Sequence, residues 1–143
     1  MSSFNVFDIA GSGMSAESVR LNTVASNLAN ADSVSGDPTQ VYQAKHPVFQ
    51  SVQALGAAAN QLSQQASASV KVSGIASNTA APEARYDPSN PLANSDGYVY
   101  SPNVNVVEEM TDMISASRAY QNNVEVMNTA RNLMLDTLKL GQS

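Results

Sequence analysis

The sequence predicts a mainly α-helical chain, in which long N- and C-terminal helices pair as a coiled coil around a small, irregular middle segment with short strands. At each end, apolar residues recur at alternating steps of three and four, which is the spacing of a coiled-coil seam. Between the ends, short alternating stretches are separated by turn-forming residues. We therefore expect a helix in residues 1–31, a strand-containing segment in residues 32–102 and a helix in residues 103–143.

The N-terminal helix carries two columns of residues at seven-residue spacing within residues 3–29. One column is large throughout, and the other is small after its first member. A seam of this kind lets two helix backbones approach closely on one side. The large column is Phe7, Met14, Leu21 and Leu28, and the second column is Phe4, Gly11, Ser18 and Ala25.

Two glycines, Gly11 and Gly13, lie inside this predicted helix. Together they cost about 2 kcal/mol of helix stability relative to alanine, and an isolated helix of this composition is marginal in water. We therefore expect contacts from outside the helix to hold it. A phosphate-binding loop is a poorer explanation, because the Gly-Lys-Ser/Thr of such loops does not follow and no strand precedes.

The C-terminal helix has clear start and stop signals. Asn105 can cap its first turn, and Glu108 follows three residues later, as in a capping box. Glu108 and Glu109 lie at the positive end of the helix dipole and Lys139 at the negative end. Gly141 is a plausible terminator.

The seam of the C-terminal helix is rich in methionine, which fills irregular gaps in cores and interfaces. For Arg131, at a seam position, both a solvent-facing side chain and a salt bridge between subunits remain open. The seam positions are Val106, Met110, Met113, Ser117, Tyr120, Val124, Met127, Arg131, Met134 and Leu138.

The middle segment predicts short strands joined by turns. Residues 70–72 and 98–100 alternate in polarity, while residues 87–91 and 95–97 carry turn signals. Residues 51–69 are a low-complexity run of Ala, Gln and Ser, which fits a loop or a weak helix.

The helices are unusual in their low charge. Charged residues make up 13% of the chain, about half the average of soluble proteins. Neutral amides stand where charges are usual, and they can hydrogen-bond across an interface without the desolvation cost of an ion, which is several kcal/mol. We expect Asn27 to bond a neighbouring chain, and Asn30 or Ala31 to mark the helix end in a left-handed conformation.

Composition argues against several functions. A net charge of −5 without a basic stripe disfavours nucleic-acid binding, and without an apolar run of roughly 18 residues no membrane insertion is expected. The N-terminus does not resemble a cleaved secretory signal. With no cysteine and only His46, we expect no metal, no cofactor and no catalytic residues.

Two stretches resemble a known family, the bacterial flagellar axial proteins. FDIAGSGMSAESVRLNTVASNLANADS, residues 7–33, is similar to the N-terminal signature of that family, including its Ala-Ser-Asn-Leu-Ala-Asn-Ala motif at residues 25–31. PNVNVVEEMTDMISASRAYQNNVEVMNTARNLMLDTLKLGQ, residues 102–142, resembles the C-terminal region of a proximal-rod member. Parts of the middle match the same member, at residues 41–45, 86–93 and 96–99.

The resemblance implies a structural subunit of the proximal rod of the flagellar basal body. Such subunits assemble with copies of themselves and other rod proteins into a tubular drive shaft around the export channel. They reach the periplasmic space through the flagellar type III export apparatus, without a cleaved signal peptide, and the basal-body base is a further partner. The residues expected at the assembly interface are Phe4, Phe7, Met14, Leu21, Asn27, Leu28, Asn30, Met110, Met113, Tyr120, Val124, Met127, Arg131, Met134 and Leu138.

Three alternatives remain beside this interpretation. Another short rod subunit would share the N-terminal motif, although the long C-terminal match argues against it. A soluble coiled-coil adaptor or a secreted effector would share the seven-residue repeats but should carry charges beside the seam, and these are scarce in residues 3–29. An enzyme is disfavoured because no nucleophile–base pair, metal cluster or cofactor motif supports it.

Overall fold

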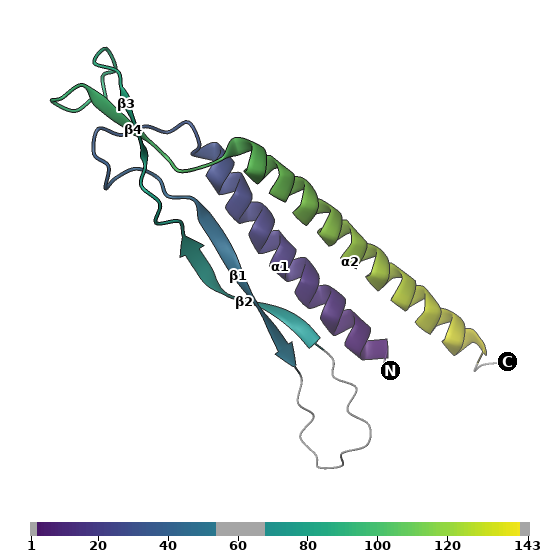
Figure 1. Cartoon of the computed structure of the whole chain (residues 1–143). Helices are drawn as coiled ribbons and strands as arrows, with labels where there is room; N and C mark the ends of the chain where they lie inside the picture. The colour runs from purple at the N-terminus through teal and green to yellow at the C-terminus, as the bar shows by residue number, and fades with distance from the viewer. Residues whose placement is uncertain (1–2, 54–67, 141–143) are drawn as a thin grey trace.

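The computed structural model describes residues 3–53 and 68–140 and has a layered arrangement. Helix α1 (Ser3–Ala29) lies in the middle. Helix α2 (Val106–Leu140) packs antiparallel along one side of it, and a hairpin of β1 (Lys45–Gln53) and β2 (Ala68–Ser77) packs along another side (Figure 1). The two predicted helices and the strand-containing middle segment are therefore confirmed.

Helix α1 ends at Ala29, and Asn30 begins the turn that follows. The side-chain amide of Asn30 donates to the carbonyl of Ser26 at 2.8 Å, which satisfies one of the carbonyls left open at a helix end. Among the described residues, no non-glycine residue has a positive φ. Asn30 thus marks the helix end as expected, but the predicted left-handed conformation is wrong, because its side chain closes the turn instead.

Helix α2 begins as the sequence predicts. The side-chain oxygen of Asn105 accepts hydrogen bonds from the backbone N–H groups of Val107, at 3.1 Å, and Glu108, at 3.4 Å. Asn105 is therefore the expected N-cap. The predicted terminator Gly141 lies outside the described residues.

The middle segment forms two antiparallel pairs of strands. The predicted strands at 70–72 and 98–100 lie in β2 and in β4 (Tyr98–Ser101), and β4 pairs with β3 (Glu83–Tyr86). The low-complexity loop predicted over residues 51–69 is too long at both ends, because pairing continues to Gln53 opposite Ala68. The rest of that loop, residues 54–67, lies outside the described residues.

The interior of the described chain contains mostly small side chains. Its buried apolar residues are Ala10, Ala16, Val24, Ala44, Val99 and Ala116. The hydrophobic contribution to stability scales with the apolar area removed from water, so alanines contribute little. Most large apolar residues therefore remain only partly covered by their own chain.

Gly36 supports a joint between the segment after α1 and strand β4. Its neighbour Ser35 exchanges two backbone hydrogen bonds with Tyr100, at 3.1 and 2.8 Å. A Cβ atom at Gly36 would lie 2.6 Å from the carbonyl oxygen of Leu92, which is backbone and cannot swing away. Close packing of backbone against backbone explains why glycine stands here.

Gly36→Ala should lower the free energy of unfolding by about 1–3 kcal/mol, because the backbone must shift to admit the methyl group. Urea unfolding of the full chain measures this value. Gly74→Ala is the matched control, since a Cβ atom there would meet nothing within 4 Å. Equal losses for the two variants would contradict the close contact at Gly36.

Candidate assembly surface

The two helices meet along a line that repeats every seven residues of α1. Each position on this line has a partner on α2, and the partners run in the opposite direction. Gly13, Arg20 and Asn27 on α1 lie against Asn123, Asp112 and Glu109 on α2. At the end of this line, Val6 lines one groove together with residues of α2 that include Ala130.

Asn27 is the centre of a buried hydrogen-bond cluster and is completely shielded from solvent. Its side-chain N–H groups donate to the carbonyl of Lys45 and to Oε1 of Glu109, both at 2.9 Å. Its side-chain oxygen accepts from the Tyr42 hydroxyl and from the Lys45 backbone N–H, also at 2.9 Å. The amide thus uses two donors and two acceptor positions to join the end of α1, the start of β1 and the first turns of α2.

The cluster corrects the expectation that Asn27 bonds a neighbouring chain. All of the bonds just described lie within one chain, and the side chain is buried. The physical reason is the chain reversal after α1, which carries Tyr42 and Lys45 back onto the helix end. The sequence gives no periodic signal for this return, so the partners of Asn27 were missed.

Glu109 is 4% exposed although it is a carboxylate. Its Oε1 accepts from Asn27, and its Oε2 is buried without a hydrogen-bond partner in the described part of the chain. Its place in the first turn of α2 puts it at the positive end of the helix dipole, which favours a negative group. Glu109 therefore does more than compensate the dipole, because it also anchors α2 to the end of α1.

Arg20 and Asp112 form an ion pair across the two helices, with an N–O distance of 2.9 Å. Both side chains are partly open to solvent, and exposed pairs of this kind are worth up to about 1 kcal/mol. Neither residue is among the positions that the sequence predicts for an interface. The pair contributes mainly to the register between the helices.

The close helix approach expected at the glycines occurs at only one of them. A Cβ atom at Gly13 would lie 2.8 Å from the side-chain nitrogen of Asn123, whereas a Cβ atom at Gly11 would meet nothing within 4 Å. Gly13 therefore lets the α2 side chain come close to the α1 backbone. Gly11 has no such packing role in the described chain.

The predicted seam of α1 is rotated by one residue from the line on which α1 meets α2. The contact line passes through Gly13, Arg20 and Asn27, one residue before the large column. Ser18 and Ala25, from the second predicted column, are exposed. The hydrogen-bond cluster around Asn27 and the close contact at Gly13 take up the line on which α1 meets α2. The large column therefore lies beside that line. Its members Phe7, Met14, Leu21 and Leu28 are each half-buried, and the side chain of Phe4 lies outside the described residues.

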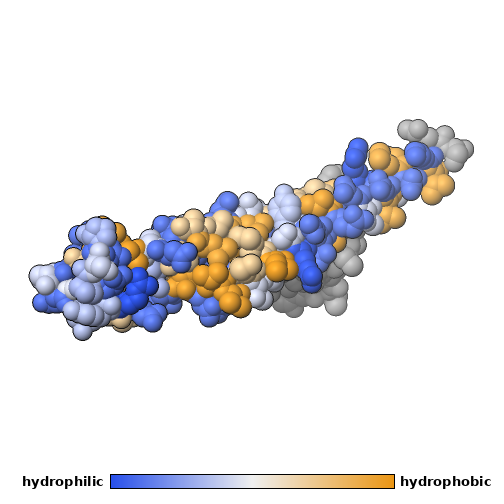
Figure 2. Space-filling model, turned by 90° about the horizontal axis from the view of Figure 1, so that it is seen from above, coloured by the Kyte–Doolittle hydropathy of each residue, from blue (hydrophilic) through white to orange (hydrophobic). Residues whose placement is uncertain are grey.

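On α2 one column of the predicted seam is displaced in the same way. Glu109 and Ala116 are buried, whereas their neighbours Met110 and Ser117 are not. Of the expected interface residues on α2, the half-buried ones are Met113, Val124, Met127 and Met134, and the exposed ones are Met110, Tyr120, Arg131 and Leu138. Figure 2 shows hydrophobic residues gathered along the middle of the molecule on the face seen there.

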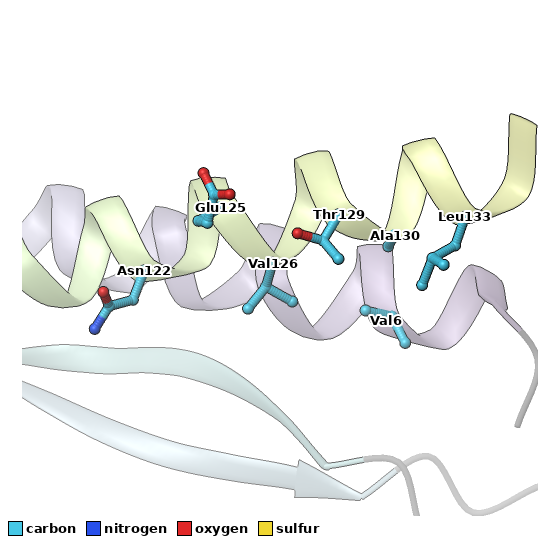
Figure 3. A pocket seen from close by; sticks show the side chains of 7 residues that line it. All are labelled: Val6, Asn122, Glu125, Val126, Thr129, Ala130 and Leu133. Carbon is cyan, nitrogen blue, oxygen red and sulfur yellow. The ribbon is translucent and has the colours of Figure 1, made fainter. Parts of the chain in front are cut away.

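A groove of about 600 Å³ lies between the N-terminal part of α1 and the C-terminal half of α2. Val126 and Leu133 point from α2 toward the side on which Val6 lies, whereas Glu125 points away from Val6 (Figure 3). Its lining is mostly apolar, with polar groups at the edge. The residues that line it are Val6, Asn122, Glu125, Val126, Thr129, Ala130 and Leu133.

The described residues hold neither a metal-binding cluster nor a membrane span. Within residues 3–53 and 68–140, no three His, Cys, Asp or Glu side chains are grouped so that they could hold a metal ion. Neither helix, as far as it is described, has the length and apolar character that crossing a membrane requires.

Known proteins resemble this chain at both helices. A family described as "Flagella basal body rod protein" matches residues 7–36, and one described as "Flagellar basal body rod FlgEFG protein C-terminal" matches residues 95–140. The chain is 51% identical over 142 residues to the flagellar basal-body rod protein FlgC of Salmonella typhimurium strain LT2, an alignment that covers 99% of this chain and 100% of the relative. The chain belongs to the FlgC family.

Other relatives carry the same name across the full length. Identity is 52% over 142 residues to FlgC of Escherichia coli O157:H7 and 42% over 144 residues to FlgC of Buchnera aphidicola subsp. Schizaphis graminum, each covering 99% of this chain and 100% of the relative. Membership of the FlgC family makes the chain a structural subunit of the flagellar basal-body rod. The regions that the two family models match contain most of α1 and all of α2.

Proposed function

We propose that this FlgC-family chain is a subunit of the proximal rod and that its large apolar columns pack against neighbouring subunits. The neighbours are copies of itself and other rod proteins, which together form a tubular drive shaft around the export channel. The carrying observation is the column Phe7, Met14, Leu21 and Leu28, which stays half-buried beside a contact line made of polar and small groups.

The energetics support an assembly role for this column. Burying a Leu, Phe or Met side chain fully contributes about 1.5–3 kcal/mol relative to leaving it exposed. The four residues of the column are partly covered within the single chain, so their own chain supplies only part of this contribution. Neighbouring helices that cover the column would supply the remainder. In the rod, the three–four spacing of the column suits coiled-coil packing between subunits.

The route to the rod follows from the same proposal. The chain leaves the cell's interior through the flagellar export apparatus, without a cleaved signal peptide, and assembles in the periplasmic space next to the basal-body base. The cysteine-free composition suits this route, because no disulfide can form between unfinished subunits in an oxidising compartment. The expected interface residues on both helices, apart from Asn27, remain part of this proposal.

Deleting the gene for this chain should stop the rod at its base, and a plasmid copy should restore complete rods and swimming. Electron microscopy of isolated basal bodies measures rod completion. Basal bodies that complete their rods without the chain would contradict the proposal. A stalled rod that the plasmid copy fails to extend, despite normal expression, would contradict it as well.

A further inference from the structure

The C-terminal end of α2 extends past the described start of α1 (Figure 1). Leu135 and Leu138 lie three residues apart on this end and therefore share one side of the helix. Their exposed fractions are 44% and 63%. Lys139 follows directly, with 79% of its side chain exposed, and its only ion pair in the described chain is a long, solvent-exposed one of 3.7 Å with Asp136. We call Leu135, Leu138 and Lys139 the α2 tip.

The groove described above has a lining that complements the tip. Val6, Val126, Ala130 and Leu133 give it apolar walls, and Leu133 is itself 64% exposed. Glu125, an exposed carboxylate, is one of the lining residues, and its side chain points away from Val6 and therefore toward solvent at the outer side of the groove (Figure 3). The groove thus offers an apolar surface and a negative group, and the tip offers leucines and a positive group.

The tip and the groove cannot meet within one chain. The tip and all of the groove's lining except Val6 belong to the continuous helix α2, so the helix would have to fold back on itself to bring them together. Resting on the proposed function, we propose that the α2 tip of one copy occupies the groove of the next copy in the rod. Leu135 and Leu138 then pack against the apolar walls, and Lys139 pairs with Glu125.

The proposed contact is one-way, because the tip of one copy fills the groove of the next copy, whereas two copies that exchanged tips about a two-fold axis would close a dimer. Each copy keeps a free tip after its groove is filled, or a free groove after its tip is bound. A head-to-tail contact of this kind builds open helical rows instead of closed dimers. The contact therefore gives a row of identical subunits a polarity and a repeat.

Engineered disulfides test the contact cleanly, because the chain has no cysteine. We expect a chain with both Leu138→Cys and Ala130→Cys to give a ladder of disulfide-linked multimers in isolated basal bodies after mild oxidation. The two positions are about 12 Å apart along one helix, and a disulfide needs Cα atoms within about 7 Å. Within one chain the bond cannot form, so every link joins two copies.

Each single-cysteine chain should give no linked species, because the tip of one copy lies against the groove of the next. Two tip cysteines, or two groove cysteines, therefore do not meet. The matched control pairs Leu138→Cys with Asn128→Cys, which is exposed on the other side of α2 from Ala130 and does not line the groove. Dimers from Leu138→Cys alone would show a tip-to-tip contact and overturn the proposal. So would equal yields from the test pair and the control pair, or no ladder from the test pair.

Charge reversal provides a second readout. Adding Lys139→Glu to the double-cysteine chain should lower the ladder yield severalfold, and adding Glu125→Lys as well should recover it. An unchanged yield in both chains would overturn the ion pair. Variants that complete rods and swim without cross-linking would disprove this contact while leaving the rod function intact. A failure of the proposed rod function would be seen separately, as complete rods in the deletion strain.

Discussion

Asn27→Asp should lower the free energy of unfolding by about 3–5 kcal/mol, because it puts a second carboxylate into a buried cluster. In the native chain, the side-chain N–H groups of Asn27 lie 2.9 Å from Oε1 of Glu109 and from the Lys45 carbonyl oxygen. An aspartate oxygen in that place faces two acceptors and cannot donate to either. Urea unfolding of the full-length variant and the native chain measures the difference.

Two further variants separate charge from the loss of hydrogen bonds. Asn27→Ser keeps a small neutral group and should lose less stability than Asn27→Asp. Combining Asn27→Asp with Glu109→Gln should recover part of the loss, since a glutamine amide can donate to the aspartate, although the Lys45 carbonyl remains opposed. If Asn27→Asp costs the same in the native background and in the Glu109→Gln background, the repulsion we derive from the 2.9 Å contact is absent.

Leu21→Ala combined with Leu28→Ala should abolish rod completion and swimming while leaving the chain exported. Truncating a buried leucine costs about 2–5 kcal/mol. Both residues are only partly covered in the single chain, so part of this cost appears when neighbours cover the surface that remains. Swimming in soft agar, electron microscopy of basal bodies and the amount of exported chain measure the three outcomes.

The control changes the exposed column on the same helix. Ser18→Ala with Ala25→Ser alters two exposed α1 positions and should leave swimming unchanged. Normal rods in the double-leucine variant would mean that this column is not covered in the assembly. A double-leucine variant that already fails to fold alone, seen as lost helical circular dichroism, would place the leucines' role within the chain and equally contradict the assembly role.

The sequence by itself determined the elements of this protein and its family. The three–four spacing predicted both helices, Asn105 predicted the start of α2, and residues 70–72 and 98–100 predicted two strands. These are local properties, because caps, turns and periodicity depend on residues a few positions apart. The motif at residues 25–31 likewise belongs to one short stretch.

The tertiary structure alone decided which residue columns are used within the chain. Hydrophobic periodicity predicted that the large column would form the helix pair, yet α1 meets α2 through Gly13, Arg20 and Asn27. Two packing requirements decided the contact line in place of the apolar seam. The buried amide of Asn27 must be hydrogen-bonded, and Gly13 permits a close approach of α2. The partners of Asn27, in the segment before β1 and in α2, lie far away in sequence. Only the folded chain could therefore show that this asparagine serves its own subunit, while the leucines beside it remain partly exposed for neighbouring subunits to cover.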